Sequence, residues 1–125
     1  MIGIDIVSIP RIQKNIDMYG EKFLKRFLND DELHLVKTAQ NAAGLWAAKE
    51  AASKALGCGI GQHLSFHDMT VEKSSLGAPY IVLCDKASTN FNIKKINISI
   101  THDGGFCAAI ALATYFRYSY TASHK

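Results

Sequence analysis

The segment from Asn41 to Leu56 constrains the fold most, because its sequence predicts one long and regular helix. It is rich in alanine, leucine, lysine and glutamate, which favour helix, and Gly57 supplies a stop signal. At about 100° per residue the apolar side chains gather on one face. That face, which we expect to point to the core, comprises Leu45, Ala48, Ala52, Ala55 and Leu56. Trp46, Glu50 and Lys54, spaced four residues apart, form a separate stripe.

Shorter elements are predicted on both sides of this helix. The β-branched residues from Ile2 to Ile9 indicate a buried strand that ends at Pro10. Residues 23–28 have helical spacing, and Asn29 with Glu32 resembles a capping box that opens a short helix through about Ala39. Further strands are expected at 69–73, 80–84, 96–101 and 106–113, a short helix at 85–91, and turns at 77–79 and 104–105. These patterns predict an α+β fold with a mainly antiparallel sheet.

Length and charge narrow the class of protein. The chain of 125 residues fits a single domain, residues 1–125, with a weakly patterned tail at 115–125 whose end we expect to be disordered. A domain of this size would gain from oligomerisation. The net charge of +3, from 14 basic and 11 acidic side chains, lacks the dense basic stripe of a nucleic-acid binder. It suits an anionic small molecule or an acidic protein partner.

The cysteines and the apolar segments bear on location. Cys58, Cys84 and Cys107 are an odd number without a close-spaced pair, which argues against a disulfide framework or a zinc site. The N-terminus lacks the pattern of a signal peptide, and no apolar run is long enough to span a membrane. We therefore expect a cytoplasmic protein.

Several charged residues are candidates for chemistry. Asp5 lies inside an apolar strand, where a carboxylate needs a cation or hydrogen-bond donors nearby. Glu50 and Lys54 have the spacing of an ordinary helix ion pair, but the same spacing suits a carboxylate on a divalent cation beside an ammonium on an anionic oxygen. His102 ends an alternating strand between Thr101 and Asp103, beside two glycines whose backbone amides could meet an anion. Spacing alone leaves the structural and the functional reading open.

Taken together and in order, these segments resemble the holo-acyl-carrier-protein synthase branch of the 4'-phosphopantetheinyl transferases. The resemblance runs from residue 2 to about residue 113, and its most specific part is the Trp46–Gly57 block combined with an N-terminal Gly-Ile-Asp. The matching stretches are Gly3-Ile4-Asp5-Ile6-Val7 with Arg11, Phe23 to Leu28, Trp46-Ala47-Ala48-Lys49-Glu50-Ala51, Lys54-Ala55-Leu56-Gly57, Gly59-Ile60-Gly61, Leu64-Ser65-Phe66 with Asp68, Gly77-Ala78-Pro79, and Ser99-Ile100-Thr101-His102.

The resemblance implies transfer of 4'-phosphopantetheine from coenzyme A to a serine of apo-acyl carrier protein, with release of 3',5'-ADP, in support of fatty-acid synthesis. It implies that Asp5 and Glu50 bind Mg²⁺ and that Lys54 contacts the phosphates. These three residues would be catalytic. Lys54, Pro79, Thr101 and His102 would bind coenzyme A, and Arg11 and Arg26 would bind the acidic helix of the carrier protein. It also implies a homotrimer with sites between subunits, so that Asp5 and His102 need not serve one site within one chain.

One position departs from the family pattern. Family members often carry arginine before the aromatic residue of the Trp-Ala-Ala-Lys-Glu block, where it can meet the 3'-phosphate of coenzyme A, whereas this chain has Leu45. Lys73 is a candidate replacement. Two other classes stay open: a metal-dependent hydrolase of nucleotides or diphosphates, and a non-enzymatic domain that binds an acidic protein through Arg11, Lys22, Lys25 and Arg26.

Overall fold

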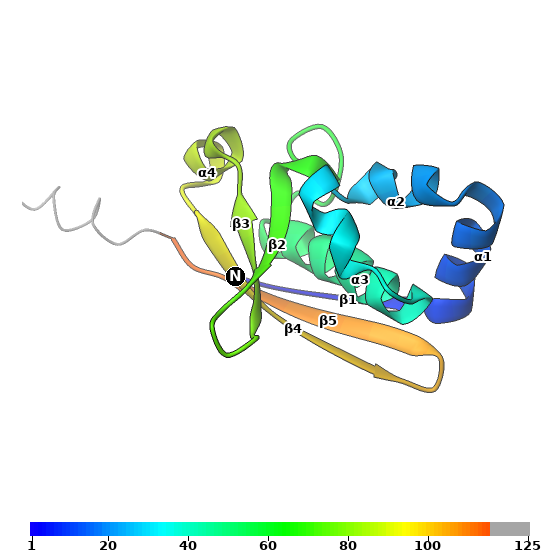
Figure 1. Ribbon diagram of the computed structural model, residues 1–125. Helices are drawn as coiled ribbons and strands as arrows, with labels where there is room; N and C mark the ends of the chain where they lie inside the picture. The colour runs from blue at the N-terminus through cyan, green and yellow to red at the C-terminus, as the bar shows by residue number, and fades with distance from the viewer. Residues whose placement is uncertain (116–125) are drawn as a thin grey trace, which may run out of the picture.

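The structure, a computed structural model, describes residues 1–115, in which helices pack against a five-stranded sheet (Figure 1). The strands lie in the order β1-β5-β4-β3-β2, and every neighbouring pair is antiparallel. In chain order the elements are β1 (Ile2–Ser8), α1 (Ile9–Tyr19), α2 (Glu21–Phe27), the 3-10 helix η1 (Asp30–Leu35), α3 (Ala39–Ala55), the 3-10 helix η2 (Phe66–Asp68), β2 (Met69–Lys73), β3 (Pro79–Leu83), α4 (Asp85–Phe91), β4 (Lys95–Asp103) and β5 (Phe106–Ala113). The predicted α+β class is confirmed.

Most predicted elements are present, with shifted ends. Strand β2, strand β5 and helix α4 have the predicted bounds. Helix α3 begins two residues earlier than predicted, because Thr38 caps it by accepting a hydrogen bond from the backbone N–H of Asn41. The helix predicted after Asn29 is a 3-10 helix that ends at Leu35. The predicted tail lies, beyond residue 115, outside the described residues.

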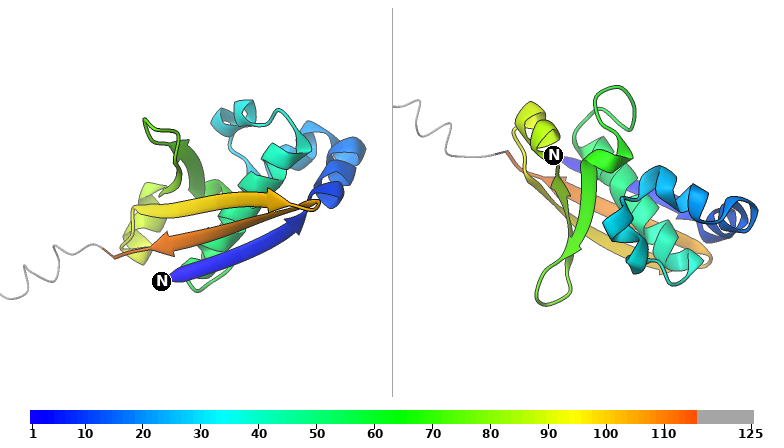
Figure 2. Two further views of the ribbon diagram at one scale, coloured as in Figure 1. Left: turned by 90° about the horizontal axis from the view of Figure 1, so that it is seen from below. Right: turned by 45° about the horizontal axis from the view of Figure 1, so that its top comes forward.

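The prediction of a fully buried first strand was wrong. Only one face of β1 is covered: Gly3 and Val7 point to α3, whereas Ile2, Ile4 and Ile6 are 65%, 66% and 65% exposed. Successive side chains of a strand alternate between faces, and no described element covers the second face (Figure 2). The strand also ends at Ser8, whose hydroxyl accepts from the backbone N–H of Arg11 and thereby starts α1, with Pro10 in its first turn.

Helix α3 lies along the covered face of β1, β5 and β4, where small side chains allow a close approach (Figure 2). A Cβ atom on Gly3 would overlap the carbonyl oxygen of Ala51 and lie 2.6 Å from the backbone nitrogen of Ala55. Ala109 and Ala111 of β5 face the same helix and are buried. The backbone of α3 therefore lies almost in contact with that of β1. This close approach places Asp5 of β1 beside Glu50 and Lys54 of α3. Within residues 1–115 no helix combines the length and apolar character needed to cross a bilayer.

We predict that Gly3→Ala destabilises the protein by about 3 kcal/mol, the upper end for an overpacked core, because strand β1 must move away from α3. Urea unfolding would measure the loss. Gly61→Ala is the matched control, since nothing lies within 4 Å of a Cβ at that position. Equal stability of the two variants would contradict the proposed close contact.

Candidate active site

Asp5, Glu50 and Lys54 come together where β1 crosses α3. The Lys54 Nζ lies 3.0 Å from the Asp5 Oδ1 and donates a second hydrogen bond, of 3.2 Å, to the backbone oxygen of Ile4. Asp5 and Glu50 both line a cavity of about 310 Å³, whose wall also includes Arg11, Phe23 and Trp46. The side chains expected to act together therefore do lie together, on two rigid elements.

The electrostatics of Glu50 differ from those of a surface glutamate. Partial burial raises the pKa of Glu50, and the negative charge of Asp5 raises it further, while Lys54 partly offsets both effects. Two carboxylates therefore face one small space and repel each other. Two carboxylates that line one small cavity form a favourable binding site for a cation.

A second cavity, of about 260 Å³, holds two of the four residues expected to bind coenzyme A, including His102, which was expected near its nucleotide end. His102 and Pro79 line it together with Lys73 and Leu45. The two cavities share no lining residue, because Leu45 and Glu50 lie on different sides of α3. Thr101 is not among the lining residues, since successive side chains of β4 point to opposite faces and that of Thr101 is exposed on the uncovered one.

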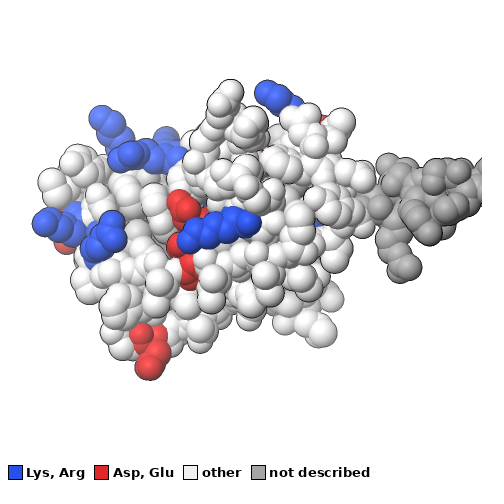
Figure 3. Space-filling view, turned by 180° about the vertical axis from the view of Figure 1, so that it is seen from behind, with Lys and Arg blue, Asp and Glu red and all other residues white. Residues whose placement is uncertain are grey.

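The expected carrier-protein residues are exposed on the helices beside the first cavity. Arg11 lies in the first turn of α1 and Arg26 in the last turn of α2. Figure 3 shows acidic side chains in contact with a basic one near the middle of the rear face, and further basic side chains on the side where α1 and α2 lie. This face therefore carries basic side chains to one side of an acidic centre.

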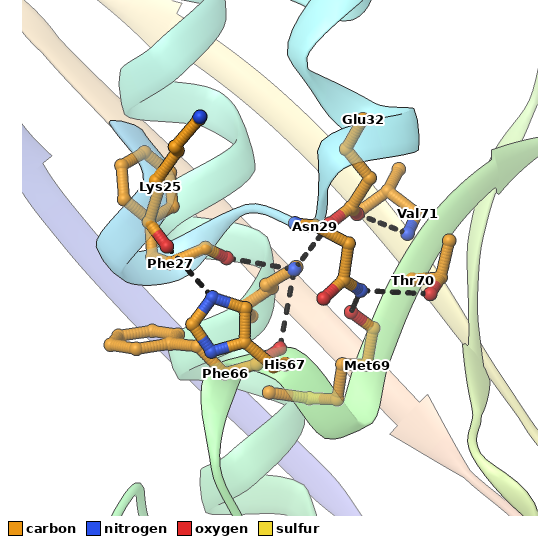
Figure 4. Close-up of polar contacts among 10 residues, drawn as sticks. Lys25, Phe27, Asn29, Glu32, Phe66, His67, Met69, Thr70 and Val71 are labelled. Carbon is orange, nitrogen blue, oxygen red and sulfur yellow. Dashed lines mark hydrogen bonds and ion pairs between the residues drawn. The ribbon is translucent and has the colours of Figure 1, made fainter. Parts of the chain in front are cut away.

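Sequence reasoning missed a buried ion pair next to the site. Lys49 and Glu32 have side chains that are 0% and 1% exposed, and Lys49 Nζ lies 2.7 Å from Glu32 Oε1 (Figure 4). Lysine and glutamate are almost never fully buried unless paired. Lys49 lies among the buried alanines of α3. A lysine at such a position in the sequence was the signal that could have indicated a buried ion pair.

A larger cavity, of about 710 Å³, lies elsewhere, between the loop of residues 57–65 and α4. It holds none of the candidate residues. Cys58 lines it, and partial burial raises the pKa of this thiol, which makes it a poor nucleophile. We therefore locate the chemistry by the charged cluster and not by cavity size.

Comparison with known proteins shows the family of this chain. Residues 1–119 match the model of the 4'-phosphopantetheinyl transferase superfamily. The holo-[acyl-carrier-protein] synthase of Campylobacter curvus is 55% identical over 114 residues, covering 91% of this chain and 100% of the relative; that of Nautilia profundicola is 55% identical over 112 residues, covering 90% and 97%. The crystal structure of Helicobacter pylori holo-[acyl-carrier-protein] synthase in complex with coenzyme A has a TM-score of 0.87 at 46% identity, covering 91% of this chain and 100% of that one.

The chain therefore belongs to the 4'-phosphopantetheinyl transferase superfamily. This membership and the fold confirm the family and the enzyme class expected from the sequence.

The raised pKa of Glu50 has a consequence for stability. The folded protein keeps a proton on Glu50 at pH values where the unfolded chain has lost it, so this contribution to stability is lost as the pH rises through the raised pKa. We predict that Glu50→Gln removes this loss and raises the stability at pH 7 by about 1 kcal/mol, a common gain when functional strain is removed. Urea unfolding of both proteins at several pH values from roughly 4 to 7 checks this prediction. Glu21→Gln, at an exposed ion pair, is the control, and an equal gain there would refute the assignment.

Proposed function

We propose that this protein transfers 4'-phosphopantetheine from coenzyme A to a serine of apo-acyl carrier protein and releases 3',5'-ADP. The observation that carries the proposal is the junction of Asp5, Glu50 and Lys54 in a chain of this family. Relatives that are more than half identical are named holo-[acyl-carrier-protein] synthase, and a structure 46% identical to this chain is a complex with coenzyme A. We place the reaction in the cytoplasm and in fatty-acid synthesis.

Asp5 and Glu50 fit a magnesium ion. Mg²⁺ prefers oxygen ligands and is usually bound by one or two carboxylates together with substrate phosphate and water. The two carboxylates line one cavity, and a divalent cation there would relieve the repulsion between their negative charges. No group of three histidine, cysteine, aspartate or glutamate side chains occurs among the described residues, so the substrate would complete the ligand set. When bound, Mg²⁺ would supply positive charge against the diphosphate of coenzyme A.

The side chains of the junction provide what phosphoryl transfer needs. Attack on a diphosphate spreads negative charge over its oxygens, so catalysis depends on positioning and on electrostatic stabilisation. Lys54 is half exposed, and its ammonium can leave Asp5 for a phosphate oxygen without losing buried contacts. Asp5 and Glu50 hold fixed positions because their backbones belong to β1 and α3, which pack closely.

The main test is mass spectrometry of an apo-acyl carrier protein after incubation with this chain, coenzyme A and Mg²⁺. We predict modification that EDTA abolishes, and losses of about 100-fold or more in Asp5→Asn and in Glu50→Gln, because each removes part of the charge that stabilises the transition state. Asp85→Asn, on exposed α4, is the control.

Full activity of both site variants would remove the metal assignment. Cleavage of coenzyme A by water alone would favour the hydrolase, and absence of both reactions would favour a binding domain.

The second cavity is our proposed site for the nucleotide end of coenzyme A. Lys73 lines the same cavity as Leu45 and His102, so its ammonium can supply the cation that position 45 lacks. Pro79 and Ile100 add apolar wall beside it. Thr101 faces the other side of the sheet, where it could serve only a site formed with another copy.

We predict that Lys73→Ala raises the KM for coenzyme A by about tenfold, the equivalent of one lost charged contact. Because the lost contact is to the 3'-phosphate, the variant should no longer distinguish coenzyme A from 3'-dephospho-coenzyme A. Steady-state kinetics with both donors measure this, with Lys86→Ala on α4 as the control. A variant that still prefers coenzyme A as strongly as the wild type would show that Lys73 is not the contact.

The uncovered face of the sheet supports assembly into a homotrimer. Its exposed apolar side chains form a continuous patch across β1 and β5, and they are Ile2, Ile4, Ile6, Phe106, Ile110 and Leu112. Apolar patches of this kind mark interfaces between proteins. The first and the second cavity, which we call the two half-sites, lie on different sides of α3. This separation supports a complete site that combines the first cavity of one copy with the second cavity of another.

We predict that sedimentation analysis finds the wild type as a trimer and Ile4→Glu as a monomer, because the new charge would have to be buried without a partner. The monomer should also lose transferase activity by about 100-fold or more, since it has only half-sites. The exposed Leu76→Glu is the control and should leave the trimer intact. A fully active Ile4→Glu monomer would place the whole site within one chain.

A further inference from the structure

Lys49 directly precedes Glu50 on α3, yet its side chain points into the protein. Its ammonium donates to the backbone oxygen of Phe27 at 2.8 Å, to Glu32 Oε1 at 2.7 Å and to the backbone oxygen of Phe66 at 3.2 Å. These three bonds use all three donors of the lysine. Because Lys49 is completely buried, it cannot touch a substrate.

Glu32 is used as fully as Lys49. One carboxylate oxygen also accepts the backbone N–H of Asn29 at 2.8 Å, and the other accepts that of Val71 at 2.7 Å. Burial lowers the pKa of Lys49, and the hydrogen bond to Glu32 works against this shift. No buried side-chain nitrogen or oxygen atom of the described residues lacks a partner, so the network is satisfied throughout.

The network holds the end of α2 in place. Three positions at and just beyond the end of α2, spaced two residues apart, are held by contacts from other segments (Figure 4). The oxygen of Lys25 contacts His67 Nε2 at 2.7 Å, the oxygen of Phe27 accepts from Lys49, and the side-chain amide of Asn29 donates to the oxygen of Met69 and the hydroxyl of Thr70. Arg26 lies between the first two of these anchors.

The aromatic cluster beside the network fixes the same segment against the same helix. Trp46, one turn before Lys49, stacks with Phe23 at a centroid distance of 6.0 Å and meets Phe27 edge-on at 5.1 Å. Phe66 packs on Trp46 at 5.0 Å. Polar and apolar contacts therefore lock α2 to the part of α3 that carries Glu50.

We infer that Lys49 is a positioning residue for recognition of the protein acceptor. Through its bonds to Phe27 and Glu32 it fixes the basic end of α2, with Arg26, at a set distance from Glu50. An acidic helix that docks on α2 then presents its serine to the junction of Asp5 and Glu50. The inference rests on the proposed transferase function and adds that the docking surface and the catalytic helix form one rigid unit.

The test is the double variant Lys49→Met with Glu32→Gln, which removes both buried charges and leaves neither unpaired. We expect the KM for the acyl carrier protein to rise by about tenfold while that for coenzyme A stays within about twofold. Hydrogen exchange at the amides of residues 21–28 should become about tenfold faster. A general loss of folded protein would instead reduce turnover with no selective effect on the carrier protein.

Ile93→Ala is the matched control, because Ile93 is fully buried beside α4 and far along the chain from this network. It should destabilise the protein without changing the KM for the carrier protein. If the double variant fails to fold, Asn29→Ala decides, since it loosens the same segment by removing the bonds to Met69 and Thr70 together with the side-chain cap of η1, and it should raise the carrier KM about threefold. Two results would overturn the inference about Lys49 and leave the transferase function standing. One is a KM for the carrier protein within about twofold of the wild type in the folded variant, and the other is an equal rise of this KM in Ile93→Ala. A wild-type chain that modifies no carrier protein would overturn the transferase function and this inference with it.

Discussion

The close contact between β1 and α3 is the constraint on which the site depends. Gly3 lets the strand approach the backbone of Ala51 and Ala55, and the small side chains of β5 continue the same surface. Asp5 follows two residues later on the same face of the strand, and Lys54 reaches it across the contact at 3.0 Å. The backbones that carry the charges of our proposed site are thus placed by apolar packing before any ligand arrives.

Helix α3 presents different side chains to the first and the second cavity. One side presents Glu50 and Trp46 to the first cavity, and the other presents Leu45 to the second. The helix itself is buried along most of its length. A helix with so few exposed side chains can serve two cavities only because each takes a different strip of its surface.

Local sequence patterns predicted most helices and strands, and they failed where burial depends on tertiary packing. Alternation in β4 and the glycine pair after Asp103 were enough to predict the β4–β5 hairpin, because both signals are local. The first strand was misjudged because three isoleucines on one face look the same in sequence whether that face meets a helix or is left open. The pair of Lys49 and Glu32 could not be predicted, since it joins residues 17 positions apart through tertiary packing. Asp5, Glu50 and Lys54 were predicted as a set from the family resemblance, and the structure brings them together.

The position of β1 at the end of the sheet has a consequence for the newly made chain. An edge strand with apolar side chains is a template on which other strands can add, and such addition leads to aggregation. Here the strand carries a carboxylate at its centre, and Lys54 bonds the backbone oxygen of Ile4. Inward-pointing charge and lysine at an edge are features by which natural sheets prevent this addition. Asp5 and Lys54 are therefore also features that disfavour the addition of another strand at this edge of the sheet.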